Sequence, residues 1–384
     1  MKKVKILVLN QYYLPGYKSG GPIRTIANMV NVLSDDFDFY IFTSDRDAVD
    51  IEAYPGIAVN AWSRVQRAHV FYADKKMRSI LGVYKIIRES PHDILYLNSF
   101  FNPIFTIIPL ILRRLSLIPK KPVVIAPRGE FSLNAIKLKK WKKMLFVFLA
   151  KTIGEYKKFI WQASSDYEKK DIQEHMPNLG ILIAPNISSN IMQEEYPEKI
   201  ETGFSVLFLS RISPMKNIEF MLNSFFHVKE NIKVFIYGPV RDEDYWLSCQ
   251  KIIPNLPNNV TVSYCGSIPH NKVQEVMSTH DLFFLPTLGE NYGHVISEAL
   301  LCGTPALIAD TTPWKNLEAD GLGWDLPLSE PKLFAEKIDY CARMSPDERL
   351  QWRRDIREKA KARVFDPSVI EANRQLFYQA LAGK

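Results

Sequence analysis

The sequence is poor in cysteine, and its four cysteines are widely scattered. None forms a C-x-x-C pair, which argues against a zinc-binding module and against a disulfide framework. The seven histidines likewise form neither an H-E-x-x-H nor an H-x-H pattern. We therefore expect four reduced thiols in a cytosolic protein, because thiols stay reduced in the cytosol. The cysteines are Cys249, Cys265, Cys302 and Cys341.

Long hydrophobic runs are also missing. The most apolar stretch, residues 103–112, is well short of the ~20 residues that a membrane-spanning helix needs, and Pro109 interrupts it. The N-terminus begins with basic residues, but its apolar run ends at Asn10 and no small-residue cleavage site follows. We therefore interpret the N-terminus as a first buried strand and not as a signal peptide.

The composition is ordinary for a globular protein, with 47% hydrophobic and 24% charged residues among 384. A chain of this length exceeds one ordinary core, so two domains are expected. Their charges differ: residues 1–190 hold 28 Lys and Arg against 16 Asp and Glu, whereas residues 191–384 hold 21 against 26. The basic half is therefore expected to face an anionic partner, either nucleic acid or a lipid surface.

Strand and helix patterns alternate along the chain, and the alternation restarts after residue 203. This order is typical of parallel sheets with helical crossovers. Residues 185–203, rich in Pro, Asn, Ser and Glu, predict a linker. We predict an α/β fold of two Rossmann-like lobes, 1–187 and 188–365, facing across a cleft. The predicted strands are 4–9, 39–43, 94–98, 123–126, 205–210, 234–237, 260–264, 281–286 and 305–309.

The most informative segment is LPTLGENYGHVISEALLCGTPAL, residues 285–307. An apolar strand ends at Pro286, a loop carries Glu290, and a helix opens near Gly293 with Glu298 two turns in. A helix N-terminus offers unpaired N–H groups and a positive dipole to a diphosphate, and glycine permits close approach. The two glutamates lie roughly 10 Å apart along this path, which suits sugar hydroxyls at one and ribose hydroxyls at the other.

This segment resembles the E-x7-E motif of glycosyltransferase family 4, retaining nucleotide-sugar enzymes of the GT-B fold. Residues 205–222 resemble the strand–Arg–loop–Lys–helix of that family, and residues 260–287 resemble its nucleotide-base border. The resemblance implies hexosyl transfer to a growing glycan, with a C-terminal helix, 366–384, that crosses back onto the first lobe. It assigns catalytic roles to Arg211, Lys216 and Glu290, and donor binding to Gly20, Gly21, Arg128, Tyr292, Gly293, His294, Val295 and Glu298.

Basic residues at Arg211 and Lys216 also meet a chemical need. The diphosphate that leaves the sugar must be stabilised by a divalent ion or by fixed cations and helix dipoles. No metal site is indicated, so we expect fixed cations and no cofactor. Three Asp-x-Asp triplets match the metal signature of another glycosyltransferase fold, but we interpret them as solvated loop acids. They are Asp36-Phe37-Asp38, Asp45-Arg46-Asp47 and Asp242-Glu243-Asp244.

The first half contributes a glycine pair and one departure from the family pattern. Gly20 and Gly21 precede a predicted helix and form a backbone-amide cradle that suits anions, although such glycines often serve only as turn residues. The segment APRGEFS places Arg128 where relatives often carry a donor-contacting histidine. Either Arg128 takes an electrostatic role or the site is arranged differently. Tyr292 likewise stands where phenylalanine is more usual.

Residues 137–151, KLKKWKKMLFVFLAK, contain six lysines and no acid. Their apolar residues recur with helical spacing, which predicts an amphipathic helix. Such a basic helix is typical of a membrane interface, or else its apolar face packs on its own sheet while the lysines face water. The apolar residues are Trp141, Met144, Leu145, Phe148 and Leu149, and the predicted anionic-membrane patch is Lys137, Lys139, Lys140, Lys142 and Lys143.

Together these features predict a retaining, metal-independent hexosyltransferase, cytoplasmic and peripherally bound to the inner face of the membrane. Its expected partners are a nucleotide-sugar donor, a glycan or lipid-linked acceptor of surface polysaccharide or lipopolysaccharide assembly, and anionic lipid, but not nucleic acid. Three alternatives stay open: an epimerase of the same fold, a dinucleotide-dependent oxidoreductase and a nucleic-acid-binding module. Gly20-Gly21 followed by Asp45 favours the oxidoreductase, but no G-x-G-x-x-G is present.

Overall fold

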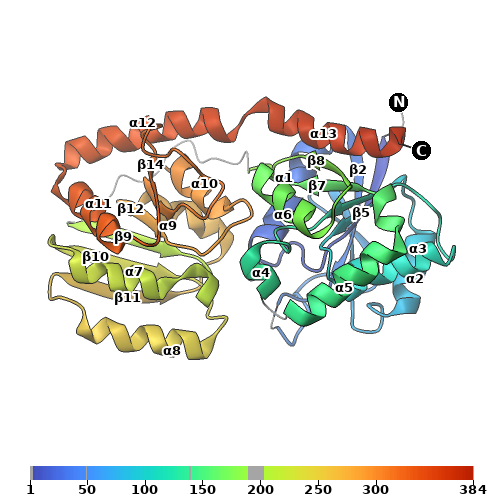
Figure 1. Cartoon of the computed structure of the whole chain (residues 1–384), viewed down its shortest axis with the longest axis horizontal. Helices are drawn as coiled ribbons and strands as arrows, with labels where there is room; N and C mark the ends of the chain where they lie inside the picture. The colour runs from blue at the N-terminus through green and yellow to red at the C-terminus, as the bar shows by residue number, and fades with distance from the viewer. Residues whose placement is uncertain (1–2, 49, 138–139, 189–202, 384) are drawn as a thin grey trace. The chain divides into compact units, whose positions relative to one another are not determined.

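The chain divides into two compact units in the computed structural model (Figure 1). The first unit comprises residues up to Ile187 together with those from Pro367 onward, and the second is Ser188–Asp366. Most of the predicted linker, residues 189–202, lies outside the described residues. The structure describes residues 3–48, 50–137, 140–188 and 203–383.

The first unit is built around an eight-stranded sheet in the order β3-β4-β2-β1-β5-β6-β7-β8. Neighbouring strands are parallel except β3 and β4, which pair antiparallel at one edge. β3, β4, β7 and β8 are absent from the predicted strands, and three of them have only four residues, too few for a clear periodicity. The strands are β1 (Val4–Leu9), β2 (Phe37–Ser44), β3 (Trp62–Val65), β4 (Ala68–Ala73), β5 (Ile94–Asn98), β6 (Val123–Ala126), β7 (Ile160–Ala163) and β8 (Gly180–Ile183).

Helices cover both faces of this sheet. Successive side chains of a strand point to opposite faces, and Leu7 and Val8 of β1 accordingly belong to two different hydrophobic clusters. The face of Leu7 packs against α2, α3 and α5, and the face of Val8 packs against α1 and α13. The helices are α1 (Gly21–Leu33), α2 (Ile80–Glu89), α3 (Ile108–Arg114), α4 (Leu133–Lys137), α5 (Lys140–Ile153), α6 (Asp166–His175) and α13 (Pro367–Ala382).

Helix α13 joins this unit from the far end of the chain. Its Phe377 ring packs edge-on against Tyr96 of β5, with ring centroids 5.3 Å apart. The Nε of Arg374 donates to the Oδ2 of Asp36 at 2.7 Å. Both contacts tie the last helix to the first hundred residues of the chain, so the first unit is discontinuous in sequence.

The second unit contains a six-stranded parallel sheet in the order β11-β10-β9-β12-β13-β14. Its central strands are short apolar runs that are buried on both faces, as parallel strands between helices must be. The strands are β9 (Phe204–Leu209), β10 (Ile232–Tyr237), β11 (Val260–Gly266), β12 (Leu282–Leu285), β13 (Ala306–Ala309) and β14 (Gly323–Leu326). The helices are α7 (Ile218–Ser224), α8 (Glu243–Ile252), α9 (Val273–Ser278), α10 (His294–Leu301), α11 (Pro331–Arg343) and α12 (Pro346–Val364).

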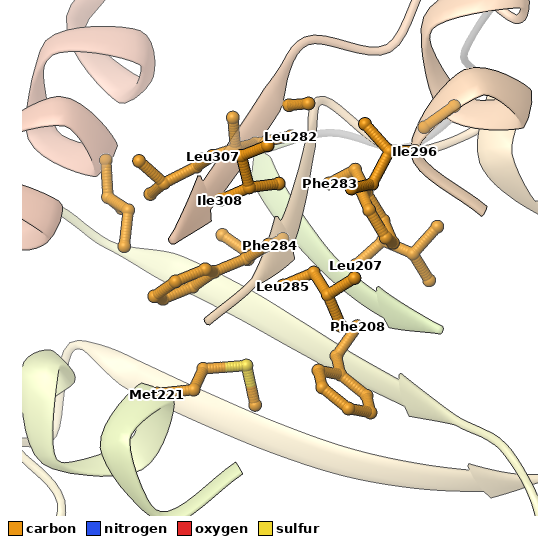
Figure 2. Packing of buried hydrophobic residues seen from close by; sticks show 14 of the residues in the cluster. Leu207, Phe208, Met221, Leu282, Phe283, Phe284, Leu285, Ile296, Leu307 and Ile308 are labelled. Carbon is orange, nitrogen blue, oxygen red and sulfur yellow. The ribbon is translucent and has the colours of Figure 1, made fainter. Parts of the chain in front are cut away.

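The core of the second unit holds the strands that lead into the predicted donor motifs. Figure 2 shows Leu207 and Phe208 of β9 beside residues 282–285 of β12, with Met221 of α7 and Ile296 of α10 packed over them. All of these side chains are fully buried. The loops that leave β9 and β12 therefore start from neighbouring, rigidly packed strands.

Candidate active site

The predicted catalytic residues follow two adjacent strands of the second sheet. Arg211 and Lys216 come after β9, and Glu290 comes after β12, which pairs with β9 in parallel. The carboxyl ends of parallel strands meet at one edge of the sheet, where ligands of such folds bind. Backbone contacts join the two loops: the N–H of Leu288 donates to the carbonyl of Met215 at 2.8 Å.

Lys216 and Glu290 form a direct ion pair between Nζ and Oε1. Both side chains are largely buried, with 9% and 14% of their surfaces exposed. Lys216 ends a short 3-10 turn, Pro214–Lys216, and Asn217 then adopts a left-handed φ of 58° before α7 begins. Lys216 and Glu290 are 74 residues apart in sequence. Their ion pair therefore joins the motif predicted to bind the donor phosphate to the motif predicted to bind the donor sugar.

Arg211 lies in the electrostatic field of the same pair. Although Arg211 is exposed as a residue, partial loss of water around its guanidinium lowers the pKa of that group, the charge of Glu290 raises it and Arg241 lowers it, so the net direction is downward. The loop carrying Arg211 is held by the N–H of Ile212, which donates to the carbonyl of Pro239 at 2.9 Å. The fold thus brings Lys216 and Glu290 into contact and places Arg211 within range of the charge of Glu290.

Gly238 makes this arrangement sterically possible. It has a φ of 144°, and a Cβ atom placed on it would lie 1.8 Å from the carbonyl oxygen of Ser210. Only glycine allows the loops after β9 and β10 to approach so closely. No sequence motif identified Gly238 or Arg241 as site residues, although the Gly-Pro turn directly after a predicted strand was a visible signal.

The E-x7-E segment turns into α10 at Gly293. Gly293 has a left-handed φ of 82° and occupies the N-cap position, where no side chain among the described residues supplies a capping hydrogen bond. His294, Val295 and Glu298 lie in the first two turns of this helix. The fold therefore places these residues at the N-terminal end of α10, as sequence analysis expected for an anion-binding terminus.

Tyr292 is held in place immediately before that helix. Its hydroxyl hydrogen-bonds the Oγ of Ser188 at 2.8 Å, and its carbonyl accepts from the Nε1 of Trp314 at 2.7 Å. Burial raises the pKa of the Tyr292 hydroxyl. A phenylalanine, which is more usual at this position, could not form the hydrogen bond that the Tyr292 hydroxyl makes with Ser188. Ser188 and Trp314 are supporting residues that no motif revealed.

The glycine pair in the first unit lies at the start of α1. Gly20 is the N-cap residue, with a φ of 69°, and Gly21 is the first residue of the helix. The preceding loop is fastened by Asp47, whose Oδ2 accepts from the backbone N–H groups of Tyr17 at 2.6 Å and Lys18 at 2.8 Å. The cradle predicted at Gly20-Gly21 is thus built on a loop with a buried carboxylate anchor.

Arg128 is bound within its own unit. Its guanidinium donates to the Oδ1 of Asn98 at 2.8 Å and of Asn186 at 2.7 Å, and also to the hydroxyl of Tyr96. Arg128 has a left-handed φ of 57°. It follows β6, whereas Gly20 and Gly21 follow β1, and β5 lies between these strands. Its predicted contact with the donor stays a prediction.

The Asp-x-Asp triplets have structural partners. Asp45 is buried and pairs with Arg46, Asp47 anchors the loop before α1, and Asp242 caps α8 by accepting from the N–H of Tyr245 at 3.0 Å. Among the described residues, no group of three or more His, Cys, Asp and Glu side chains is placed to hold a metal ion. The solvated-loop interpretation is therefore wrong for Asp45 and Asp47, which are buried.

The lysine-rich segment forms α4 and α5, and its lysines differ in their surroundings. Lys137, Lys140 and Lys142 are exposed, whereas Lys139 lies outside the described residues. Lys143 departs from the predicted patch: its Nζ donates to the carbonyl of Ala135 at 2.7 Å, so it faces its own unit. None of the helices in the described ranges has the length and apolarity needed to cross a membrane.

Comparisons with known proteins find one family and one curated relative that match parts of this chain. Residues 192–363 match the family of glycosyl transferases group 1. An uncharacterized 41.2 kDa protein in the cps region of Klebsiella pneumoniae is 22% identical over 253 residues, which cover 63% of this chain and 67% of that protein.

Solved structures share the fold over nearly the whole chain. HepE of Anabaena, in complex with UDP and glucose, has a TM-score of 0.66 at 16% identity and covers 98% of this chain and 99% of its own. Sucrose-phosphate synthase of Thermosynechococcus elongatus has a TM-score of 0.74 at 14% identity, with both chains covered completely. The lipopolysaccharide outer core galactosyltransferase WaaB in its apo form has a TM-score of 0.62 at 13% identity, covering 98% and 99%.

At these identities the structures establish the fold, and the family match covers most of the second unit. The dinucleotide-dependent oxidoreductase considered above has no support from either. The chain has the GT-B fold, and residues 192–363 of its second unit match the glycosyl transferases of group 1.

Proposed function

We propose that the protein transfers a hexosyl unit from a nucleotide diphosphate sugar to a glycan or lipid-linked glycan, with retention at the anomeric carbon. The observation that carries this proposal is the Lys216–Glu290 pair, with Arg211 beside it, at the strand ends that lead to the α10 N-terminus. This arrangement offers cations and a helix terminus to a diphosphate. It also offers a carboxylate to the sugar that adjoins the diphosphate.

In the proposed reaction the bond between the anomeric carbon and the donor phosphate oxygen breaks while a bond to an acceptor hydroxyl forms on the same face. Arg211, Lys216 and the N-terminus of α10 stabilise the charge that develops on the diphosphate. Glu290 holds the sugar, Glu298 holds the ribose, and the leaving phosphate accepts the acceptor's proton. These roles require no divalent ion, so we propose a metal-independent enzyme.

The names of similar proteins favour a role in surface polysaccharide or lipopolysaccharide biosynthesis. One relative belongs to a cps region, and one similar structure is a lipopolysaccharide galactosyltransferase. HepE binds UDP and glucose, which supports a nucleotide-sugar donor here. A lipid-linked acceptor would explain the basic first half of the chain, so we propose peripheral attachment to anionic lipid on the cytoplasmic face of the membrane.

A panel of nucleotide sugars tests the donor assignment by thermal stabilisation. A ligand that binds the folded protein at a hundredfold excess over Kd stabilises it by about 2.7 kcal/mol, which a melting curve resolves. The sugar that stabilises most is then incubated with candidate acceptors, and the anomeric configuration of the product is read by NMR. Inversion would contradict retention. Conversion of the donor to another nucleotide sugar without any acceptor would instead indicate an epimerase.

A further inference from the structure

The outer side of α5 carries an exposed apolar stripe. Trp141 is 77% exposed and Phe148 is 62% exposed, and their neighbours on the same helical face are exposed as well. Single exposed hydrophobic residues are common on protein surfaces, but a contiguous set marks an interaction surface. The stripe consists of Trp141, Met144, Leu145, Phe148 and Leu149. The sequence-based alternative, in which this face packs on its own sheet, is therefore wrong.

The opposite side of α5 fixes the orientation of the helix. Val147 and Ala150 are buried in the hydrophobic cluster on the face of the sheet that carries Leu7. The ring of Phe146 packs against that of Phe100, with ring centroids 5.3 Å apart. Lys143 faces the same side, with its Nζ 4.9 Å from the centre of the Phe101 ring. Turning the helix to bury the stripe would remove these contacts, so the stripe is held outward by the core.

Lysines border the stripe on both edges. At about 100° per residue, Lys140 and Lys151 fall on one edge of the apolar face and Lys142 on the other. All three are exposed, and α5 contains no acidic residue. This distribution complements a surface that is apolar below and anionic above. It opposes a symmetric dimer through the same face, because two copies would bring their lysines together without carboxylates to pair with them.

Exposed apolar residues continue on α2 and α3, which lie on the same face of the sheet as α5 (Figure 1). Leu81 of α2 is 78% exposed and Ile111 of α3 is 51% exposed, and Leu115, which directly follows α3, is 62% exposed. Residues 75–158, which include all three helices, hold 18 Lys and Arg against four Asp and Glu. One of those acids, Glu130, is half-buried and accepts from the hydroxyl of Ser99 at 2.7 Å. The apolar stripe thus belongs to a segment of the chain with a large excess of positive charge.

We infer that the outer face of α5 inserts into an anionic lipid bilayer at the boundary between headgroups and acyl chains. Trp141 and Phe148 enter the apolar layer, while Lys140, Lys142 and Lys151 remain at the lipid phosphates. The inference rests on the membrane attachment included in the proposed function and adds its mode. Lysines attract the protein to the surface, and the apolar stripe supplies binding that salt does not screen.

Vesicle co-sedimentation of the full-length protein tests this mode. Trp141→Ser/Phe148→Ser should lower partitioning onto phosphatidylglycerol vesicles about tenfold or more, because two large side chains no longer leave water. The matched control, Phe226→Ser/Leu247→Ser, removes two exposed apolar side chains of the second unit and should bind as the wild type does. Vesicle binding should also produce a blue shift in tryptophan emission that Trp141→Phe lacks while binding equally well.

Three outcomes would overturn the inference. The first is equal vesicle binding by Trp141→Ser/Phe148→Ser and the wild type, since lysine attraction alone would then suffice. The second is equal wild-type binding to phosphatidylglycerol and neutral phosphatidylcholine vesicles. The third is a dimer in sedimentation velocity that the double variant abolishes while the wild type ignores vesicles. Nucleotide-sugar stabilisation, measured without vesicles, separates these results from a failure of the proposed reaction.

Discussion

Among single residues, the Lys216–Glu290 pair is the one that the proposed function uses both to bind the donor and to act on it. Each charge compensates the other in a largely buried position, and each has been assigned to a different part of the donor. A diphosphate that approaches Lys216 therefore competes with Glu290. When it displaces the carboxylate from Nζ, Glu290 becomes available to the sugar. Binding of the nucleotide would in this way release the residue that positions the hexose.

Two glutamine substitutions separate the roles of the acids. Glu290→Gln removes the competitor for Lys216, so affinity for the bare nucleoside diphosphate should be kept or increased. Transfer should nevertheless fall about 10²-fold, the loss typical for a group that acts on the transition state. Glu298→Gln should weaken nucleotide affinity about tenfold, the equivalent of one hydrogen bond to a charged group. Calorimetry and initial rates measure both. Equal affinity losses in the two variants would contradict this division.

The stability of the pair can be tested independently of the reaction. Lys216→Met leaves a buried carboxylate without its partner and should lower the free energy of unfolding by ~3 kcal/mol. Lys216→Met/Glu290→Met removes both charges and should regain most of that loss. Lys272→Met, which breaks an exposed ion pair with Glu275, is the control and should change stability by less than ~0.5 kcal/mol. Chemical denaturation measures all three, and a double variant no more stable than Lys216→Met would refute buried-charge compensation.

The elements that position the site are neighbouring strands whose loops are fastened by backbone hydrogen bonds. β9 and β12 pair in the centre of the second sheet, and the loop after β12 donates from Leu288 to the loop after β9. The loop after β10 then supports Arg211 through Ile212 and Gly238. Arg211 therefore depends on backbone geometry in three consecutive strands of the sheet.

Gly238→Ala is expected to disturb this geometry. The new Cβ would overlap the Ser210 carbonyl in addition to the strained φ, so stability should fall by about 3 kcal/mol or more, and the transfer rate should fall with it. Gly266→Ala is the control, because Gly266 also has a positive φ of 75° but a Cβ there meets no atom within 4 Å. It should lose only about 1–2 kcal/mol. Thermal denaturation and initial rates measure both, and equal losses in the two variants would show that the close approach to Ser210 is unimportant.

At the scale of the whole molecule, the features that the proposed function uses are divided between the two units. The second unit contains the cation–carboxylate cluster and the helix terminus, and the first contains the glycine cradle and the basic, partly apolar surface of α5. We propose that the second unit binds the donor and the first the acceptor. Such a division would place the donor chemistry in the second unit and the attachment to the membrane in the first.

Chelation tests whether the second unit needs a metal ion. Because Arg211, Lys216 and the α10 N-terminus are proposed to stabilise the diphosphate, EDTA should leave the transfer rate largely unchanged. The measurement is the initial rate with purified protein before and after dialysis against EDTA. Loss of activity that manganese restores would contradict fixed-cation stabilisation and would direct attention to acidic side chains outside the cluster.

The sequence by itself determined the α/β class, the central strands of both sheets and the segments that carry the site. Those features are visible in short stretches of sequence. A buried parallel strand is a continuous apolar run, and a glycine can mark the residue at which a helix begins. Short edge strands such as β3 and β8 escaped detection, since four residues contain too few repeats for a period to appear. The E-x7-E segment was recognisable because its strand, loop and helix are consecutive.

Only the tertiary structure decided which side chains meet and which faces are covered. Lys216 reaches Glu290 because two strands far apart in sequence are neighbours in the sheet. Arg128 binds Asn98, the last residue of β5, and Asn186, which follows β8, and these partners are far from it in sequence. Helical spacing showed that α5 has an apolar face, but either face of an amphipathic helix with aromatic residues on both sides can be the buried one. The fit of Phe146 and Val147 to the core left Trp141 and Phe148 in contact with solvent.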